Sequence, residues 1–149
     1  AQCLVGSEMC IRDRSLTAYG SNSDEAVSKA VQEINRLDAM FSVGNEDSDV
    51  TKINENGSGE VSEETAFIMN RAMQVSKETK GAFDITIYPV MELWGFTTKN
   101  YRVPESSEIT EVLKHVSYTN VGINGQQVTL SDGASIDLGG IAKGYTPQG

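Results

Sequence analysis

The spacing of apolar residues predicts two long helices in the first half of the chain. Over residues 24–40, apolar side chains recur three or four positions apart behind Ser23, a residue type that caps helix N-termini. Over residues 62–80 the same spacing recurs behind Ser62, acidic residues follow this cap, and Gly81 can end the helix. Each predicted helix therefore has an apolar face that must pack on other elements.

A third helix and a loop complete the helical pattern. Pro104, followed by Ser106 and Ser107, is typical of a helix start, and apolar residues at helical spacing come next. Residues 41–59, in contrast, are rich in Ser, Asn, Asp, Glu and Gly and contain few apolar side chains. We expect a loop there.

Short alternating runs predict strands beside these helices. Residues 15–19 alternate apolar with small polar side chains and end at a glycine. Residues 121–123 and 127–130 flank an Asn-Gly pair, which is the sequence signal for a two-residue hairpin turn, and residues 134–138 are a further candidate strand. Because no internal repeat is visible, we expect an α+β fold: one domain with a mixed or antiparallel sheet packed with helices.

The overall charge limits what the chain can bind. Over 149 residues the formal net charge is -9, and no cluster of Lys and Arg is dense enough to offset it, which disfavours nucleic-acid binding. A ligand that carries phosphates would need a local device: a metal ion, a positioned lysine, or backbone amides at a turn or helix start.

Both ends of the chain predict a fragment. Residues 1–14 fit neither a helix nor a strand, and SEMCIRDR at 7–14 resembles translated sequencing-adapter sequence, so we expect residues 1–14 to be non-native. The chain stops at Gly149, just after what reads as a turn that opens a helix. A domain is not expected to end where an element begins. We therefore expect residues 15–149 to be the N-terminal part of a domain that is truncated at both ends.

The first segment with candidate chemistry reads GAFDIT at 81–86, followed by YP at 88–89 and LWGF at 93–96. Its small residues would let a ligand approach the backbone closely, and Asp84 and Thr86 offer hydrogen-bonding groups. The alternative is a helix end that leads into a buried strand, with the aromatic residues in the core. Spacing alone favours this alternative.

The second segment reads SIDLGGIAKGY at 135–145. A strand that runs into a glycine pair and a helix start exposes backbone groups that can hold a pyrophosphate or its metal ion. Lys143 would add a positive charge there and Asp137 an acceptor. The glycine pair matches neither the Walker pattern nor the dinucleotide fingerprint, and a plain tight turn is the alternative.

In this order, the two segments resemble the FAD:protein FMN transferase family, formerly described as thiamine-biosynthesis lipoproteins. The resemblance extends upstream to LDAMFS at 37–42, Ser48 and Asn54, and it covers residues 15–145. Several motifs in the right order are more specific than any one of them. The resemblance implies that residues 15–149 are the N-terminal part of a flavin transferase domain.

The resemblance also implies roles for individual residues. A stretch that lines the FAD site is matched by Ala82, Phe83 and Asp84. Two positions that contact FAD are matched by Asp137 and Lys143, and Lys143 is the implied catalytic residue. Gly140 matches a position whose backbone carbonyl helps to hold Mg²⁺. The remaining metal ligands of the family, an aspartate and a threonine, are expected beyond Gly149.

Two departures from the family pattern affect the implied FAD site. Many members have an aromatic residue after the phenylalanine and serine at 41–42 that stacks on the flavin nucleotide, and here that position is Gly44. Either a neighbouring residue supplies the platform or FAD is held differently. The family's N-terminal Met-Gly-Thr, whose methionine contacts FAD, is also missing, because residues 1–14 stand in its place.

The implied reaction is Mg²⁺-dependent transfer of FMN from FAD onto a Ser or Thr hydroxyl of an acceptor flavoprotein, with release of AMP. The implied acceptor is the FMN-binding domain of a membrane redox complex, and the implied location is extracytoplasmic, as a membrane-anchored lipoprotein. Two alternatives stay open: an Mg²⁺-dependent FAD pyrophosphatase and a non-catalytic flavin-binding protein. The fragment itself is expected to be inactive, since the metal site has a single visible contributor.

Overall fold

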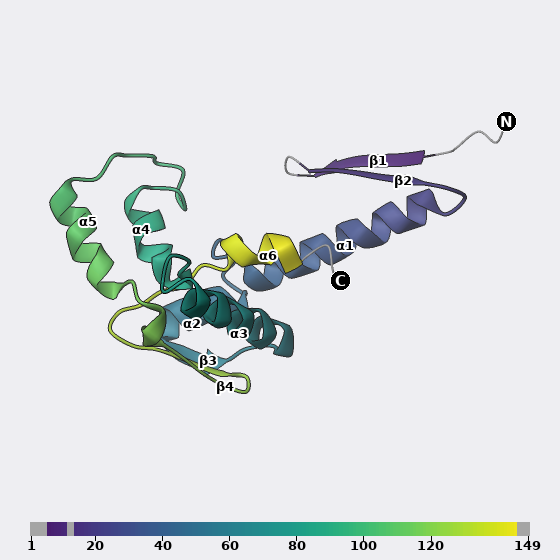
Figure 1. Ribbon diagram of the computed structural model, residues 1–149. Helices are drawn as coiled ribbons and strands as arrows, with labels where there is room; N and C mark the ends of the chain where they lie inside the picture. The colour runs from purple at the N-terminus through teal and green to yellow at the C-terminus, as the bar shows by residue number, and fades with distance from the viewer. Residues whose placement is uncertain (1–5, 12–13, 146–149) are drawn as a thin grey trace. The chain divides into compact units, whose positions relative to one another are not determined.

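The computed structural model describes residues 6–11 and 14–145, and the chain forms two compact units (Figure 1). The first unit ends at Asp38 and the second begins at Ala39. All the residues predicted to form the functional site belong to the second unit.

The first unit consists of a hairpin and most of one helix. Strand β1 (Gly6–Ile11) pairs antiparallel with β2 (Arg14–Tyr19), and helix α1 (Ser23–Phe41) follows. The predicted strand and helix of this region are confirmed. The expectation that residues 1–14 contain no strand is wrong for β1, because its backbone pairs with β2 along its full length and that pairing does not depend on side-chain alternation. Their non-native origin stays a prediction.

Helix α2 (Asp49–Asn56) lies where the sequence predicted a loop. The hydroxyl of Ser48 accepts a hydrogen bond from the backbone of the first turn at 2.9 Å, and Gly57 ends the helix in the left-handed conformation with φ 70°. Its two apolar side chains, Val50 and Ile53, are buried. Two apolar residues one turn apart are enough to fix so short a helix, but they make too weak a periodic signal to predict it.

The other helices follow from Ser62 onward. Ser62 caps α3 (Glu63–Glu78) as predicted, and its hydroxyl accepts from the amide of Thr65. Helix α5 (Ser106–Val112) begins where Pro104 and the serines predicted. Short helical turns fill the connections: η1 (Ile85–Ile87), α4 (Tyr88–Leu93), η2 (Leu113–His115) and η3 (Tyr118–Asn120). The alternative of a buried strand after Gly81 is therefore wrong, since η1 and α4 occupy that segment.

The sheet of the second unit is antiparallel, in the order β3 (Ser58–Glu60), β5 (Gln127–Leu130) and β4 (Val121–Asn124). The α+β fold with an antiparallel sheet is confirmed. The predicted hairpin is present, but Asn124 pairs with Gln127, so the turn residues are Gly125 and Gln126 rather than the Asn-Gly pair. Gly125 has φ 61°, a conformation that favours glycine in a tight turn.

Residues 134–138 form no strand, although the sequence predicted one. Alternate residues of this segment are buried, as in a strand, but its backbone joins no sheet ladder. The fully buried apolar side chains of the second unit come from this segment and from α2, α3, η1 and β5: Val50, Ile53, Ile68, Met69, Ala72, Ile85, Val128, Ile136 and Leu138. Helix α2 packs on β3 and β5, and α3 contacts η1 and α6 (Gly139–Tyr145) (Figure 1).

The Asp49 carboxylate joins the starts of α2 and α3. Its Oδ2 accepts hydrogen bonds from the Ser62 amide at 2.9 Å, the Ser62 hydroxyl at 2.7 Å and the Thr65 hydroxyl at 2.5 Å. Burial raises the pKa of Asp49, but the hydrogen bonds from Thr65 and Ser62 outweigh it, so the pKa lies below its ordinary value. The ionised carboxylate therefore stabilises the junction of the two helices.

Asp49→Asn tests this junction. We expect the free energy of unfolding at pH 7 to fall by about 1–2 kcal/mol, because an amide accepts these bonds less strongly and solvent screens part of the site. The Asp49 contribution is fully present above the unfolded pKa of about 3.9 and is lost as pH falls through the lower folded pKa, so the gap between variant and parent should close in acid. Urea unfolding at pH 7 and pH 3 measures both effects. Equal losses in Asp49→Asn and in the exposed control Asp47→Asn would contradict the assignment.

Candidate functional site

Asp84, a predicted FAD contact, begins η1 and holds it in place. Its Oδ1 accepts from the amide of Thr86 at 2.9 Å and from the Thr86 hydroxyl at 2.7 Å, while Oδ2 accepts from the amide of Tyr118 at 2.7 Å. The Thr86 side chain is fully buried. Because a carboxylate offers about four acceptor positions, these three bonds leave capacity for one further donor. Asp84 is thus an internal anchor, and its predicted contact with FAD stays a prediction.

The two segments singled out in the sequence meet in the structure. The amide of Asp137 donates to the carbonyl of Ile85 at 2.8 Å. A Cβ atom at Gly140 would lie 3.2 Å from Cε2 of Phe83, so the phenylalanine ring packs closely over a glycine backbone. Residues 82–84 and 137–140 are therefore neighbours although more than 50 residues separate them in the sequence.

Helix α6 (Gly139–Tyr145) carries the remaining predicted site residue, Lys143. The Asp137 carboxylate accepts from the amide of Gly139 at 2.5 Å, which fixes the turn into the helix. Lys143 is exposed in the last turn. At the end of α6 the Tyr145 ring meets those of Phe41 and Phe67, with centroids 6.1 and 6.0 Å away, and these contacts hold the helix against the core.

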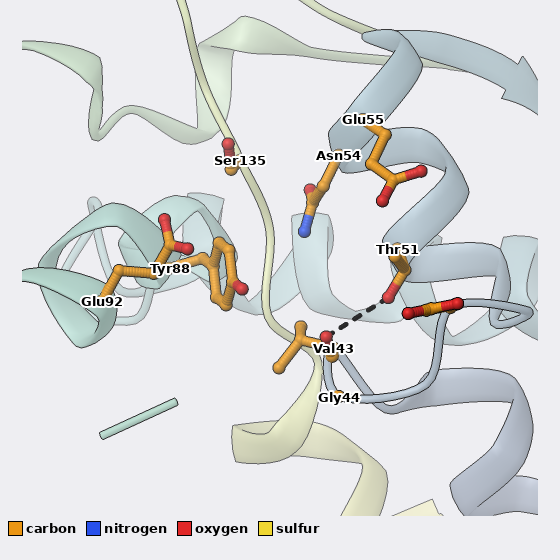
Figure 2. A pocket seen from close by; sticks show the side chains of 9 residues that line it. Val43, Gly44, Thr51, Asn54, Glu55, Tyr88, Glu92 and Ser135 are labelled. Carbon is orange, nitrogen blue, oxygen red and sulfur yellow. Dashed lines mark hydrogen bonds between the residues drawn. The ribbon is translucent and has the colours of Figure 1, made fainter. Parts of the chain in front are cut away.

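A cleft of about 390 Å³ opens beside this meeting point (Figure 2). Its walls are formed by the loop after α1, by α2, by α4 and by the 134–138 segment. The lining residues are Val43, Gly44, Glu46, Thr51, Asn54, Glu55, Tyr88, Glu92 and Ser135. This lining includes none of the six predicted site residues, although Ser135 is only two residues before Asp137.

The lining of the cleft is acidic. It includes Glu46, Glu55 and Glu92, and among the residues that line it there is no Lys or Arg. The Tyr88 ring points into the cleft between α4 and α2 (Figure 2). Burial raises the pKa of Tyr88, with further contributions from the charge of Glu92, its hydrogen bond and the charge of Asp137, so the hydroxyl stays protonated. Such a lining repels phosphate groups and suits uncharged ligand parts that donate hydrogen bonds.

Apart from Gly44, which the family resemblance had placed at the flavin nucleotide, the cleft residues are the part of the site that sequence reasoning missed. Tyr88 and Glu92 are four residues apart, a spacing that places two side chains on the same helix face. This four-residue spacing indicates a shared face only if the segment is known to be helical, and α4 was not predicted. Asn54 belongs to the upstream part of the family resemblance, but nothing placed it in a cleft, because the sequence predicted a loop where α2 lies.

Comparison with known proteins identifies the family to which this fold belongs. A family model described as the ApbE family matches residues 10–148. The chain belongs to the ApbE family. The family inferred from the two sequence segments is thereby confirmed. The match covers both segments, and within the described residues it includes α1, the sheet, the cleft and α6.

Proteins similar to this ApbE-family chain are longer than it is. A Haemophilus influenzae protein named FAD:protein FMN transferase is 28% identical over 89% of this chain and 41% of its own length. A Vibrio cholerae protein of the same name is 32% identical over 80% of this chain and 39% of its own. This chain therefore spans about two fifths of the length of these relatives.

Solved structures show the same fold. The ApbE protein from Thermotoga maritima has a TM-score of 0.86 at 36% identity, over 97% of this chain and 50% of that one. The apo flavinyl transferase ApbE from Pseudomonas stutzeri has a TM-score of 0.83 at 21% identity, over 97% of this chain and 52% of that one, a likeness that concerns the fold alone. The present chain thus corresponds to about half of each structure.

Asp84→Ala tests the anchoring role of this carboxylate. We expect the free energy of unfolding to fall by about 2–3 kcal/mol, because the Tyr118 amide and the Thr86 hydroxyl lose a charged acceptor. Urea unfolding measures the loss, and amide exchange at Tyr118 should become faster. The exposed neighbour is the control: Ala82→Ser should change stability by less than about 0.5 kcal/mol. Unchanged exchange at Tyr118 would show that another group holds this amide.

Proposed function

We propose that this protein moves FMN from FAD onto a Ser or Thr hydroxyl of an acceptor flavoprotein and releases AMP. The observation that carries the proposal is the meeting of residues 82–85 with residues 137–140, through the Asp137 to Ile85 hydrogen bond and the packing of Phe83 on Gly140. Membership in the ApbE family and the names of the Haemophilus and Vibrio relatives support it.

The proposed reaction is phosphoryl transfer. The acceptor hydroxyl attacks the phosphorus on the FMN side of the FAD pyrophosphate, its proton passes to solvent water, and the bond from that phosphorus to the bridging oxygen breaks as AMP leaves. Catalysis of this kind consists mainly of positioning and of neutralising developing charge. Because the cleft is acidic, the phosphates belong outside it, next to the exposed Lys143. Lys143 would then offset negative charge on the pyrophosphate.

The residues present can supply only part of the ligand set that Mg²⁺ needs. The Gly140 carbonyl is a hard oxygen donor of the type that Mg²⁺ prefers, and Asp137 adds a carboxylate in the preceding turn. Among the residues that the structure describes, no group of three or more His, Cys, Asp or Glu side chains could hold a metal ion. Gly140 would therefore contribute one ligand, with others from FAD, water or further sequence. When bound, the ion would neutralise charge on the pyrophosphate.

The partner and the location are part of the same proposal. The acceptor would be the FMN-binding domain of a membrane redox complex, and the protein would act outside the cytoplasm as an anchored lipoprotein. In the described part of the chain, no helix is both long and apolar enough to span a membrane.

A transfer assay with the complete product of the gene that encodes this chain tests the proposal. Incubation with FAD, Mg²⁺ and an acceptor domain should give a flavinylated acceptor and AMP, detected by mass spectrometry and chromatography. Lys143→Ala should lower kcat/KM by about tenfold or more, because a charge that faces the transition state is removed. Lys114→Ala, which removes an exposed lysine paired with Glu111, is the matched control. An unchanged rate in Lys143→Ala would exclude this role.

The same assay separates the alternatives. Free FMN and AMP without a flavinylated acceptor would identify an FAD pyrophosphatase, in which water replaces the hydroxyl. Tight retention of FAD without AMP release under Mg²⁺ would identify a flavin carrier. Either result would refute the transferase proposal.

Gly44→Tyr tests where the flavin nucleotide lies. A Cβ atom at Gly44 would meet only the Ser42 hydroxyl, at 3.7 Å, so a side chain fits on this wall of the cleft. If FAD occupies the cleft, a ring there can stack on it and lower the Kd for FAD by about two- to tenfold. Quenching of flavin fluorescence measures the Kd, and Gly44→Ala is the control without a ring. Equal affinities in the two variants would place FAD elsewhere.

A further inference from the structure

The Asn54 side chain binds a backbone 82 residues away with both ends of its amide. Its Nδ2 donates to the carbonyl of Ile136 at 2.9 Å, and its Oδ1 accepts from the amide of Ile136 at 2.7 Å. This pair of bonds satisfies the same two groups that a neighbouring strand would satisfy. Among the side-chain types, only an amide offers a donor and an acceptor at this spacing on a short, nearly rigid stem.

The Asn54 contact is one of the two long-range backbone supports described for the 134–138 segment, whose first amide, that of Ala134, donates to the nearby Ser131 carbonyl. On one side Asn54 holds Ile136, and the next amide, that of Asp137, donates to Ile85. The Ile136 and Leu138 side chains are fully buried, so the segment cannot turn outward to find water. Since this segment belongs to no sheet, its buried backbone groups depend on these bonds.

The supported segment leads directly into α6. The carbonyl of Leu138 accepts from the amides of Ile141 at 3.0 Å and Ala142 at 2.8 Å, so the helix starts one residue after the segment that Asn54 holds. A shift at Ile136 would therefore be passed to Gly140 and Lys143. The same Asn54 side chain also lines the cleft (Figure 2).

We propose that Asn54 is a positioning residue of the flavin site. By holding Ile136, it sets the place of Asp137, Gly140 and Lys143 relative to residues 82–84, and it acts through them rather than on FAD. This inference rests on the proposed function for its catalytic consequence. Its structural part, that α6 is held through Asn54, can be measured without any reaction.

Hydrogen exchange on the 149-residue chain tests the structural part. Asn54→Asp is isosteric, keeps the acceptor for the Ile136 amide, and places an oxygen against the Ile136 carbonyl instead of a donor. We expect amides of residues 137–142 to exchange about fivefold faster or more, with the amides of α3 unchanged. The matched control is Asn56→Asp in the same helix, because the Asn56 side chain is exposed and donates within α2, to the Lys52 carbonyl at 2.8 Å. Unchanged exchange over 137–142 would overturn the inference.

A double-mutant cycle on the complete gene product tests the catalytic part. Asn54→Asp should lower kcat for FAD processing by about tenfold or more, with KM for FAD within about twofold. Combined with Lys143→Ala, it should lower kcat by less than the product of the two single losses, because Lys143 is one of the groups that Asn54 positions. Additive losses, or a wild-type kcat in Asn54→Asp, would overturn the positioning role.

The outcomes separate the inference from the proposed function. A wild-type protein that does not process FAD would refute the proposed function, and the exchange result would then decide alone whether Asn54 holds α6. Asn54→Ala, which removes both bonds, should give faster exchange than Asn54→Asp. If Asn54→Ala does not fold, the isosteric variant and its Asn56 control carry the test.

Discussion

A backbone segment without a sheet partner is the constraint on which the site depends. Residues 134–138 run through the interior of the second unit with Ile136 and Leu138 fully buried, yet they join no strand ladder. Their polar groups are satisfied by a side-chain amide on α2 and by a carbonyl of η1. The path of this segment therefore depends on two elements that are distant in sequence. Because α6 begins directly after the segment, the position of α6 depends on the same contacts.

Carboxylates hold much of the second unit together in the same manner. Asp49 joins α2 to α3, Asp84 joins η1 to the Tyr118 backbone, and Asp137 fixes the turn into α6. Each accepts hydrogen bonds from backbone amides, an interaction that is stronger for an ionised than for a neutral acceptor. Some of the acidic residues that make this chain so negative are therefore partly buried structural supports.

The sequence predicted the parts of the fold whose signals are local. Helices α1 and α3 were predictable because long apolar stripes follow Ser23 and Ser62, and the hairpin because a turn signal lies between two short apolar runs. Helix α2 was missed because only Val50 and Ile53 mark its buried face.

The site was predictable only in part, because its contacts are not local. The resemblance identified both segments that meet, but no pattern along the chain shows that Asn54 faces Ile136 or that Tyr88 and Gly44 line the same cleft. The 134–138 segment was assigned as a strand because apolar residues alternate along it, and these residues are indeed the buried ones. Alternation reports burial, whereas a strand also needs a neighbouring backbone.

The acidic cleft has a consequence for how the proposed substrate arrives. FAD carries two negative phosphates, and both the net charge of the chain and the carboxylates of Glu46, Glu55 and Glu92 repel it at long range. Such repulsion slows diffusional encounter, most strongly at low ionic strength. A nucleotide whose phosphates are already screened by a cation meets a smaller barrier, so the field of the protein favours the cation-bound form before any contact is made.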